Sequence, residues 1–495
     1  MLMPDPDQKI LDRRADIVEA LRRIVPGNGV IAERAGMSVY ECDGLTAYRQ
    51  LPLVVVLPET VEQVSDVLRY CTAEGLKVVP RGAGTSLSGG ALPLADGVVL
   101  GMSRFDRIHN IDYANRCITA GPGVTNLALT KAVEGAGFYY APDPSSQIAC
   151  TIGGNVAENS GGVHCLKYGL TTNNLLGLQM VLMDGTVVRL GGSHLDAGGY
   201  DLLGVVTGSE GLLGVVTEVT VRILPRPPAA RALLIGFPTA VAAGTCVGRI
   251  MASGIVPAGM EMMDRPAIHA AEAFCHPGYP LDVEALLIVE LDGPVEEVDE
   301  LVGRVEAIAT ATGASLVRAS RDEAERMAFW AGRKAAFPAV GRIAPDYYCM
   351  DGTIPRGRLP EVLEGIAELS KKYGLACANV FHAGDGNLHP LVLYDANALG
   401  QLERAEAFGS DILRLCVAVG GVLTGEHGVG VEKRDLMPEM FSDVDLGIQL
   451  RLKSAFDPLG LLNPGKVFPL LHACAEMGRV HVHGGATRFP ELPRF

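Results

Sequence analysis

Several features are scarce or missing in this 495-residue chain, and each absence excludes a class of protein. Lysine and arginine number 42 against 57 aspartates and glutamates, so the formal charge is −15. A basic surface for nucleic acid is therefore not expected. The 11 cysteines are scattered with no CxxC pair, which excludes an encoded iron–sulfur cluster or zinc knuckle. Most of them are expected to be small buried hydrophobic residues.

Long apolar runs are also missing. No window offers about 18 uninterrupted apolar residues, and the first 25 residues lack the apolar core of a signal peptide. We therefore expect a cytoplasmic protein without a direct membrane span. With 48% hydrophobic and 20% charged residues, the chain has the composition of a soluble globular protein, and its length predicts two or three domains.

Glycine is abundant, with 60 residues in the chain, well above the usual share of about 7%. The excess gathers at 82–101, 153–169, 191–214 and 420–430. Glycine is favoured where the backbone must turn tightly or come close to another group. These four segments are therefore the first places to look for a binding site.

The first glycine segment follows a strand–helix–strand pattern. A buried strand is predicted at 51–58 and a helix at 61–74, because Thr60 and Gln63 have the spacing of a capping box and Gly75 suits the C-terminal cap. The next strand runs straight into PRGAGTSLSGG. A nicotinamide-binding Rossmann loop would read GxGxxG, but the third glycine is missing here, so that form of dinucleotide site is excluded.

The loop at 81–90 nevertheless offers backbone N–H groups and the hydroxyls of Thr85, Ser86 and Ser88, which could wrap a pyrophosphate. A plain tight turn is the alternative. Two further glycine-rich segments follow, at 142–169 and at 208–219, the latter containing Glu210. Three such segments within 140 residues are more than turns alone require.

Beyond the proline-rich linker LPRPPAA at 224–230, strands and helices alternate. This pattern predicts an α+β sandwich of the ferredoxin-like kind, with helices on one face of a sheet. Helices are expected at 239–252 and 295–312, and a final helical part near 440–466.

The stretch FHAGDGNLHPL at 381–391 is typical of a β-hairpin. With Asp385 and Gly386 in a two-residue type I′ turn, His382 would face His389 across the strands. Two such imidazoles can reach one metal ion, although a hydrogen-bonded pair is the alternative. Glu426, in TGEHGVG, would be a third ligand and leave an open coordination position. Its neighbour His427 would point the other way as a general base, or else be a solvated loop histidine.

Six ordered segments between about 50 and 467 together resemble one family. PRGAGTSLSGG, TIGGNVAENSGG, GSEGLLGVVTEV, FHAGDGNLHP, TGEHGVGVEK and LNPGKVF resemble FAD-linked oxidases of the vanillyl-alcohol oxidase/p-cresol methylhydroxylase (PCMH) type. The similarity is to the branch of D-lactate and D-2-hydroxyglutarate dehydrogenases, and the segment 330–356 is most similar to the FAD-binding subunits of bacterial glycolate oxidases.

The resemblance implies an α+β fold with a PCMH-type FAD-binding domain and a ferredoxin-like substrate (cap) domain. We expect an N-terminal helical extension at 1–49, the FAD domain at 50–226 and the cap at 227–420. A C-terminal segment at 421–470 would pack on the FAD domain, followed by a tail at 471–495, in which metal binding by His481 and His483 is not favoured.

The resemblance also assigns site residues. FAD would be bound non-covalently, because Thr85 stands where members with covalent FAD carry histidine. The predicted FAD-binding residues are Pro80, Arg81, Gly82, Ala83, Gly84, Thr85, Ser86, Gly89, Asp143, Ser146, Thr151, Gly153, Gly154, Asn155, Asn159, Gly161, Glu210, Gly211 and Val216. His382, His389 and Glu426 match the family's metal site, for zinc, manganese or iron.

The implied activity is oxidation of a D-2-hydroxy acid, with His427 taking the hydroxyl proton and a cation fixing the carboxylate. Arg333 is the first candidate for this cation, with Lys334 and Arg342 as alternatives. Phe337 and Cys349 replace polar residues of relatives that oxidise D-2-hydroxyglutarate, which favours glycolate or D-lactate over that longer acid. The implied partners are an iron–sulfur subunit and a second flavoprotein-like subunit, through which the protein would reach the inner membrane.

Overall fold

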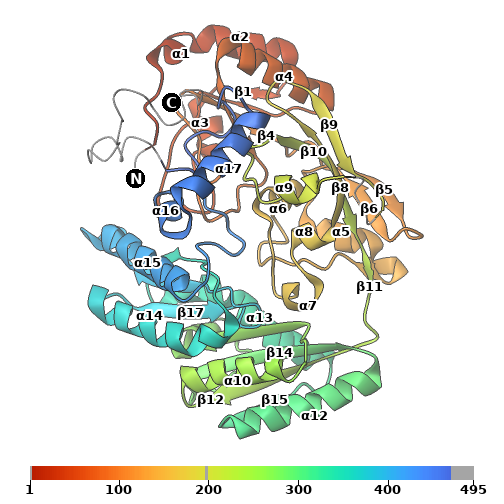
Figure 1. Ribbon diagram of the computed structural model, residues 1–495, viewed down its shortest axis with the longest axis vertical. Helices are drawn as coiled ribbons and strands as arrows, with labels where there is room; N and C mark the ends of the chain where they lie inside the picture. The colour runs from red at the N-terminus through yellow and green to blue at the C-terminus, as the bar shows by residue number, and fades with distance from the viewer. Residues whose placement is uncertain (1–2, 195–198, 470–495) are drawn as a thin grey trace.

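The computed structural model describes residues 3–194 and 199–469, so the predicted tail at 471–495 lies outside the described residues. Two α+β units face each other in it (Figure 1). The first, red to yellow in the figure, carries the glycine loops, and the second, green to cyan, is the predicted cap. Helix α17 (Asp443–Phe456) returns to the first unit, where the Lys453 ammonium donates to the Leu212 carbonyl at 2.6 Å.

A four-stranded sheet in the order β1-β2-β4-β3 begins the first unit. Strands β2 (Val54–Val56), β4 (Gly97–Gly101) and β3 (Lys77–Arg81) are parallel, and β1 (Val30–Ile31) is antiparallel to β2. Helix α4 (Val61–Glu74) connects β2 and β3. The Gln63 N–H donates to the Thr60 hydroxyl at 3.2 Å, but the Gln63 side chain accepts from the Glu59 N–H at 2.8 Å, so only half of the predicted capping box forms. Gly75, with φ +68°, is the predicted C-terminal cap. Strand β3 therefore ends where the first glycine loop begins.

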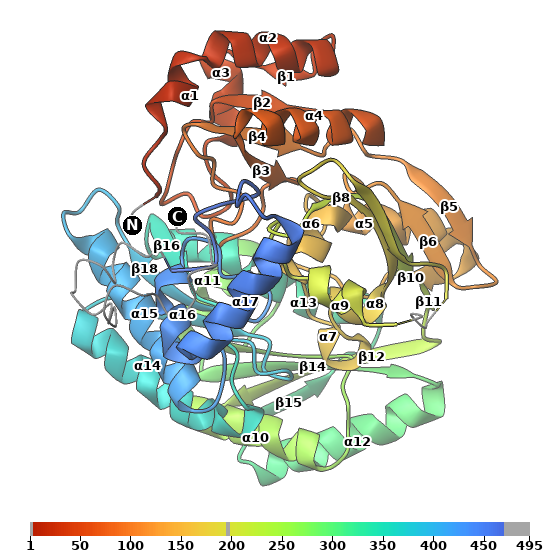
Figure 2. The same ribbon diagram turned by 45° about the horizontal axis from the view of Figure 1, so that its top comes forward.

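The N-terminal residues are built into this unit. Helices α1 (Gln8–Asp12), α2 (Arg14–Ile24) and α3 (Arg34–Met37) precede or flank β1, and they gather at one end of the molecule (Figure 2). Ile17 and Leu21 of α2 are fully buried in the same core as Leu68 of α4. The segment before residue 50 is thus helical, but it also adds a strand to the first sheet.

A five-stranded antiparallel sheet completes the first unit, in the order β5-β6-β10-β8-β9. Its strands are β5 (Ile108–Asp112), β6 (Cys117–Ala120), β10 (Val215–Arg222), β8 (Leu175–Val181) and β9 (Val187–Gly191). Around it lie α5 (Asn126–Val133), α6 (Ile152–Glu158), α7 (Cys165–Tyr168), α8 (Thr171–Asn174) and α9 (Leu202–Val206). Strand β11 (Leu224–Pro225), in the predicted linker, pairs with β7 (Phe138–Tyr139) before the chain enters the cap.

The cap is a seven-stranded sheet in the order β15-β12-β14-β13-β17-β18-β16. Its strands are β12 (Ala229–Phe237), β13 (Gly259–Asp264), β14 (Ala285–Gly293), β15 (Leu316–Ala319), β16 (Asp346–Cys349), β17 (Cys377–Phe381) and β18 (Pro390–Tyr394). Every pairing in it is antiparallel.

Helices cover both faces of the cap sheet, so the prediction of helices on one face is wrong. On one face lie α10 (Ala240–Ala252), α12 (Val295–Ala311), α14 (Leu359–Tyr373) and α15 (Gln401–Ala418). On the other lie α11 (Arg265–Cys275) and α13 (Glu323–Ala339). The sequence of β14 reflects this, because its first five residues are all apolar instead of alternating with polar ones, and they are buried on both faces of the sheet.

The histidine hairpin has a different register from the predicted one. His382 pairs with Asn387, and this pair encloses the four residues 383–386 of the connection between β17 and β18. Gly386, with φ +88°, is in the left-handed region, but Asp385 is not. A type I′ turn is therefore absent at this position. The predicted pairing was shifted by two residues, and a shift of two leaves each side chain on its original face. His382 and His389 consequently remain neighbours, on a diagonal of the hairpin.

Candidate functional site

A cavity of about 510 Å³ lies between the two units, and we call it the main cavity. Fifteen of the predicted FAD-binding residues line it: Pro80, Arg81, Gly82, Ala83, Gly84, Thr85, Ser86, Ser146, Thr151, Gly153, Gly154, Asn155, Glu210, Gly211 and Val216. The remaining four, Gly89, Asp143, Asn159 and Gly161, are not part of its lining. Three glycine segments that are far apart in the sequence thus form one wall.

This wall has the properties of a cradle for a polar ligand. At Gly82 an added Cβ would lie 2.6 Å from the Thr151 hydroxyl, and Gly84 has φ +72°, so glycine is needed for both space and conformation. Arg81 Nη1, Thr151 Oγ1 and Glu158 Oε2 are buried and have no hydrogen-bond partner within the described part of the chain. Buried polar atoms without partners are costly, so a ligand that satisfies them fits here.

Gly161 contacts Glu426. Its N–H donates to Glu426 Oε2 at 3.0 Å, which connects the second glycine segment to the candidate metal ligand instead of to the cavity. Asp143 accepts from the ring and the backbone N–H of His164.

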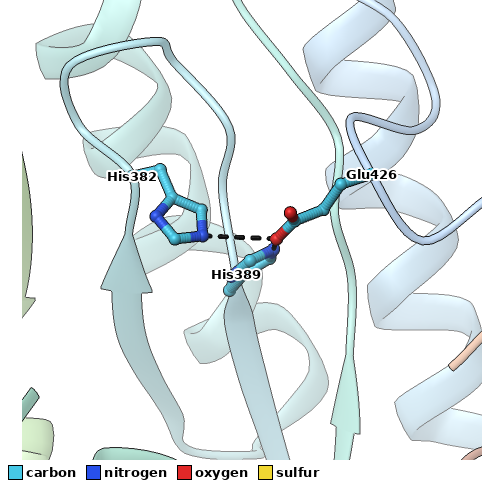
Figure 3. Close-up of side chains that lie close together, drawn as sticks. All are labelled: His382, His389 and Glu426. Carbon is cyan, nitrogen blue, oxygen red and sulfur yellow. Dashed lines mark hydrogen bonds and ion pairs between the residues drawn. The ribbon is translucent and has the colours of Figure 1, made fainter. Parts of the chain in front are cut away.

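His382, His389 and Glu426 converge next to this cradle (Figure 3). Their ligand atoms all lie within 4.8 Å of one another. Glu426 Oε1 is 3.2 Å from Nε2 of His382 and 3.4 Å from Nε2 of His389. His389 and Glu426 also line the main cavity, so this triad opens onto the space that the glycine segments enclose.

The electrostatics of the triad fit a cation. Although burial raises the pKa of Glu426, its contact with His382 lowers the value to about 2, so the carboxylate is charged. Burial lowers the pKa of His389 well below its usual value, which keeps this imidazole neutral. Neither of its ring nitrogens has a hydrogen-bond partner among the residues described. A neutral imidazole with a free nitrogen, next to a carboxylate, is a suitable donor set for a divalent ion.

A second carboxylate, Glu261, orients His382 of the triad. Oε1 of Glu261, on β13, is 2.7 Å from Nδ1 of His382. Its Oε2 contacts Nε and Nη2 of Arg333 at 2.7 and 2.6 Å. Such a carboxylate fixes the orientation of a ligand histidine and its tautomer. Arg333 is only 1% exposed and does not line the main cavity. Its placement argues against the predicted contact with a substrate carboxylate.

Of the two alternatives to Arg333, Lys334 lines the main cavity. Arg342 is exposed and lies over the ring of Phe274. Phe337 also lines the cavity, with its ring 5.9 Å from that of His389. Cys349 is buried in the cap core outside the lining.

His427 lies on the cavity wall and stacks on His389, with ring centroids 4.8 Å apart. Burial lowers the pKa of His427, and its Nδ1 has no hydrogen-bond partner in the described ranges. Asp351 Oδ2 lies 3.9 Å from that nitrogen. The ring is thus held in its neutral form.

The loop that carries Glu426 and His427 is fixed by two buried carboxylates, one from each unit. Asp351 Oδ2 accepts the N–H groups of Gly425, Glu426 and His427 at 3.1, 2.9 and 2.7 Å. From the first unit, Glu210 accepts the next pair of N–H groups, from Val429 and Gly430, at 2.6 and 2.7 Å. Glu210 thus supports this loop as well as lining the cavity.

Lys433 balances the charge of Asp351, at 2.7 Å, and both side chains are fully buried. Burial alone would raise the pKa of Asp351, but the Lys433 ammonium holds it below its usual value. Glu261, Asp351 and Lys433 were not found by sequence reasoning. A signal existed for Glu261, which stands between methionines in the strand GMEMMD, three residues before the terminal Asp264.

Comparison with known proteins identifies the family. The description "FAD linked oxidases, C-terminal domain" matches residues 226–467, and "FAD binding domain" matches residues 52–191. The chain is 57% identical to glycolate oxidase subunit GlcD of Escherichia coli K12, over 100% of this chain and 98% of that protein. The chain belongs to the FAD-linked oxidase family.

Two other relatives extend this comparison. Glycolate oxidase subunit GlcD of Bacillus subtilis is 37% identical over 92% of this chain and 97% of its own length. A D-lactate dehydrogenase of Archaeoglobus fulgidus is 34% identical over 84% of this chain and 91% of its own length.

Solved structures support the same fold. A 4-ethylphenol oxidase of Gulosibacter chungangensis superimposes with a TM-score of 0.79, at 18% identity, over 94% of this chain and 99% of that chain. A p-cresol methylhydroxylase with bound substrate also gives 0.79, at 17% identity, over 95% and 99%. The predicted family and PCMH-type fold are confirmed, and this FAD-linked oxidoreductase carries the family's FAD-binding domain. No helix in the described part of the chain is long and apolar enough to cross a bilayer.

Proposed function

We propose that this FAD-linked oxidase converts a short D-2-hydroxy acid, glycolate or D-lactate, to the 2-oxo acid with the help of a divalent metal ion. One observation carries the proposal. The metal-ligand triad, His427 and the glycine cradle all line or adjoin one cavity, so deprotonation of an alcohol and transfer of its C–H hydride can occur at one place. The names of the relatives in E. coli and A. fulgidus support the substrate class.

His382, His389 and Glu426 would hold the ion, with zinc, manganese and iron all compatible with two nitrogen donors and one oxygen donor. FAD would be bound without a covalent bond, since Thr85 lies at the cradle position where covalent members have histidine. When bound, FAD supplies the acceptor for the hydride, and the ion supplies positive charge that acidifies a nearby hydroxyl.

His427 would take the hydroxyl proton. It faces the main cavity, its Nδ1 lacks a hydrogen-bond partner among described residues, and its lowered pKa keeps the ring in the basic form at neutral pH. Asp351 would not be the proton acceptor, because three backbone N–H groups and Lys433 already occupy it. General-base catalysis of this kind typically contributes about 10²–10⁴ in rate.

Lys334 would meet the substrate carboxylate, because it is the one of the three candidate cations that lies on the cavity wall. Phe337 makes the adjoining wall apolar, so a second carboxylate would be buried without a partner there. This favours a two- or three-carbon acid. D-2-hydroxyglutarate or another longer hydroxy acid is the alternative.

Electrons would leave through other subunits. The E. coli relative is described as a subunit of glycolate oxidase, which supports assembly with partners. We propose an iron–sulfur subunit and a second flavoprotein-like subunit, with attachment to the inner membrane only through them.

The test is anaerobic flavin reduction of the FAD-loaded protein by glycolate, D-lactate, L-lactate and D-2-hydroxyglutarate, with and without chelator. We expect glycolate or D-lactate to bleach the flavin fastest and chelator to slow it. His427→Ala should keep FAD and metal but lose reduction, whereas His382→Ala should lose metal first. A folded protein that binds FAD but is reduced by none of these acids would contradict the proposal, as would equal metal loss in both variants.

A further inference from the structure

A second cavity of about 280 Å³ lies beside the main one and has no role in the chemistry above. We call it the side cavity. It is lined by Thr130, Asp143, Val163, His164, Arg226, Arg326, Met327, Trp330 and Lys334. The first four belong to the FAD unit and the last four to α13 of the cap, so this cavity follows the seam between the two units.

The two cavities share their walls. Lys334 lines both of them. Along α13, Arg326, Trp330 and Lys334 are four residues apart and therefore lie on one face of the helix, which continues to Phe337 and Pro338 in the main cavity. At 1.5 Å per residue, the path from Arg326 to Phe337 is about 16 Å long.

The opposite wall is continuous as well. Asp143 lines the side cavity and its neighbour Pro144 lines the main cavity. Ser160 of the main cavity is followed three residues later by Val163 of the side cavity. The same two chain segments therefore border both cavities.

The side cavity is cationic, and its carboxylates are already engaged. Asp143 is 2.9 Å from Nδ1 of His164. Glu290 is 2.6 Å from Nη1 of Arg326 and also contacts Trp330. Burial would lower the pKa of His164, but Asp143 and Glu290 raise it well above the usual value. The imidazole therefore stays positively charged between them.

Two of the cations are available to an incoming anion. Lys334 forms no ion pair with any described residue, and Arg226, half-exposed at the rim, has only a long 3.5 Å contact with Glu134. A formal charge of −15 on the whole chain repels anions in general. Clefts with local positive charge counteract such repulsion and raise the concentration of an anionic ligand.

We propose that the side cavity is the access chamber for the anionic hydroxy acid, which passes along α13 and whose carboxylate Lys334 receives at the junction with the main cavity. This inference rests on the proposed function for the identity of the anion. It adds a route and a charge requirement that neither the triad nor the cradle explains.

Met327 offers a clean test, because it lines the side cavity, is 49% exposed and makes no ion pair. We compare three variants of the FAD-loaded full chain, Met327→Glu, Met327→Gln and Met327→Lys. They give position 327 a negative, a neutral and a positive side chain. At low ionic strength the second-order rate constant of anaerobic flavin reduction should increase from Glu to Gln to Lys, by about two-fold per unit charge. The three values should converge at high salt, while the limiting rate at saturating substrate stays the same.

Val444 is the matched control, since it is 69% exposed on α17 and outside both cavities. Val444→Glu and Val444→Lys change the net charge equally and should change the rate constant much less. Equal rate constants in the Met327 series, or a change as large in the Val444 series, would overturn the proposal.

A second readout separates the access chamber from the proposed function. The chain has one tryptophan, and Trp330 lines the side cavity. Quenching of its fluorescence by iodide should increase from Met327→Glu to Met327→Lys, whereas quenching by neutral acrylamide should not change. If no hydroxy acid reduces the flavin but iodide quenching still increases from Met327→Glu to Met327→Lys, the proposed function is wrong and the access chamber for anions is supported. If a hydroxy acid reduces the flavin but iodide quenching is equal in the Met327 variants, the access chamber is wrong and the proposed function is supported.

Discussion

The glycine cradle and the candidate metal-ligand triad meet at one cavity but are built in opposite ways. The cradle is made of backbone from three loops of one unit, and its glycines leave space that a Cβ would fill. The triad is made of side chains from the β17–β18 hairpin and from the loop after α15, and buried carboxylates hold it. Glu261 contacts His382, and Asp351 accepts backbone N–H groups of the loop that carries Glu426. The cradle should therefore be sensitive to added atoms, and the triad to lost charges.

The largest effect is expected at Asp351, where charge matters most. Asp351→Asn leaves Lys433 buried without its main counter-ion, although Glu432 is 3.2 Å away. Breaking a buried ion pair costs about 3–5 kcal/mol, so the free energy of unfolding measured in urea should fall by this amount.

Asp299→Asn is the control for Asp351→Asn, because it removes an exposed ion pair with Arg231, worth about 0–1 kcal/mol. Adding Lys433→Met to Asp351→Asn should restore part of the loss. If Asp351→Asn and Asp299→Asn lowered the free energy of unfolding equally, this account of the loop would be contradicted.

His164 lies at the seam between the FAD unit and the cap and provides a pH-dependent test. Its contacts with Asp143 and Glu290 raise its pKa above that of the unfolded chain, so the protonated ring stabilises the folded state. This stabilisation is complete below about pH 6.5 and is lost as the pH rises through the raised pKa.

His164→Asn should therefore lower the free energy of unfolding by about 1.5–3 kcal/mol near pH 6, with a smaller difference at alkaline pH. Urea unfolding of both proteins across this pH range measures the difference. His269→Asn, whose ring meets the Leu281 carbonyl on an exposed helix face, is the control. A difference that grows with pH would have the wrong sign for this mechanism.

The next effect is the loss of metal affinity expected when Glu261, which orients His382, loses its charge. Glu261→Gln keeps the size of the side chain but removes the charge that orients His382 and balances Arg333. Loss of such a supporting carboxylate typically weakens metal binding about 10–100-fold. Competition with a chelator, with Glu284→Gln at an exposed ion pair as the control, measures the change. FAD affinity should be nearly unaffected, and an equal loss of FAD would show that cradle and triad are not separate.

The elements that sequence reasoning predicted well are those with local signals. Helix α4 begins and ends where Thr60 and Gly75 indicate, because caps are decided by residues next to the helix. The glycine segments were found because backbone demands appear directly as glycine. His382 and His389 remained neighbours despite the wrong register, since the error was two residues and faces alternate with that period.

The parts that were missed depend on contacts between distant segments. Arg333 is followed at once by Lys334, and nothing in WAGRK indicates which of the two faces Glu261 and which the cavity. That choice is made by the packing of α13 on the cap sheet. Asp351 was missed for the same reason, because the loop it holds begins more than 70 residues later.

The smallest effect tests the cradle itself. Gly84→Ala and Gly75→Ala both place a side chain at positive φ, +72° and +68°, and should each lower the free energy of unfolding by about 1–2 kcal/mol. Only Gly84 lines the main cavity, where the added Cβ would overlap the Arg81 guanidinium, while Gly75 caps α4 with open space around it. FAD affinity, measured by flavin fluorescence, should therefore fall in Gly84→Ala alone. If both variants lost FAD equally, backbone strain anywhere in the unit would explain the loss, and the close approach of ligand to the cradle would not be needed. If neither did, the cavity wall at 82–86 would not be the surface that FAD contacts.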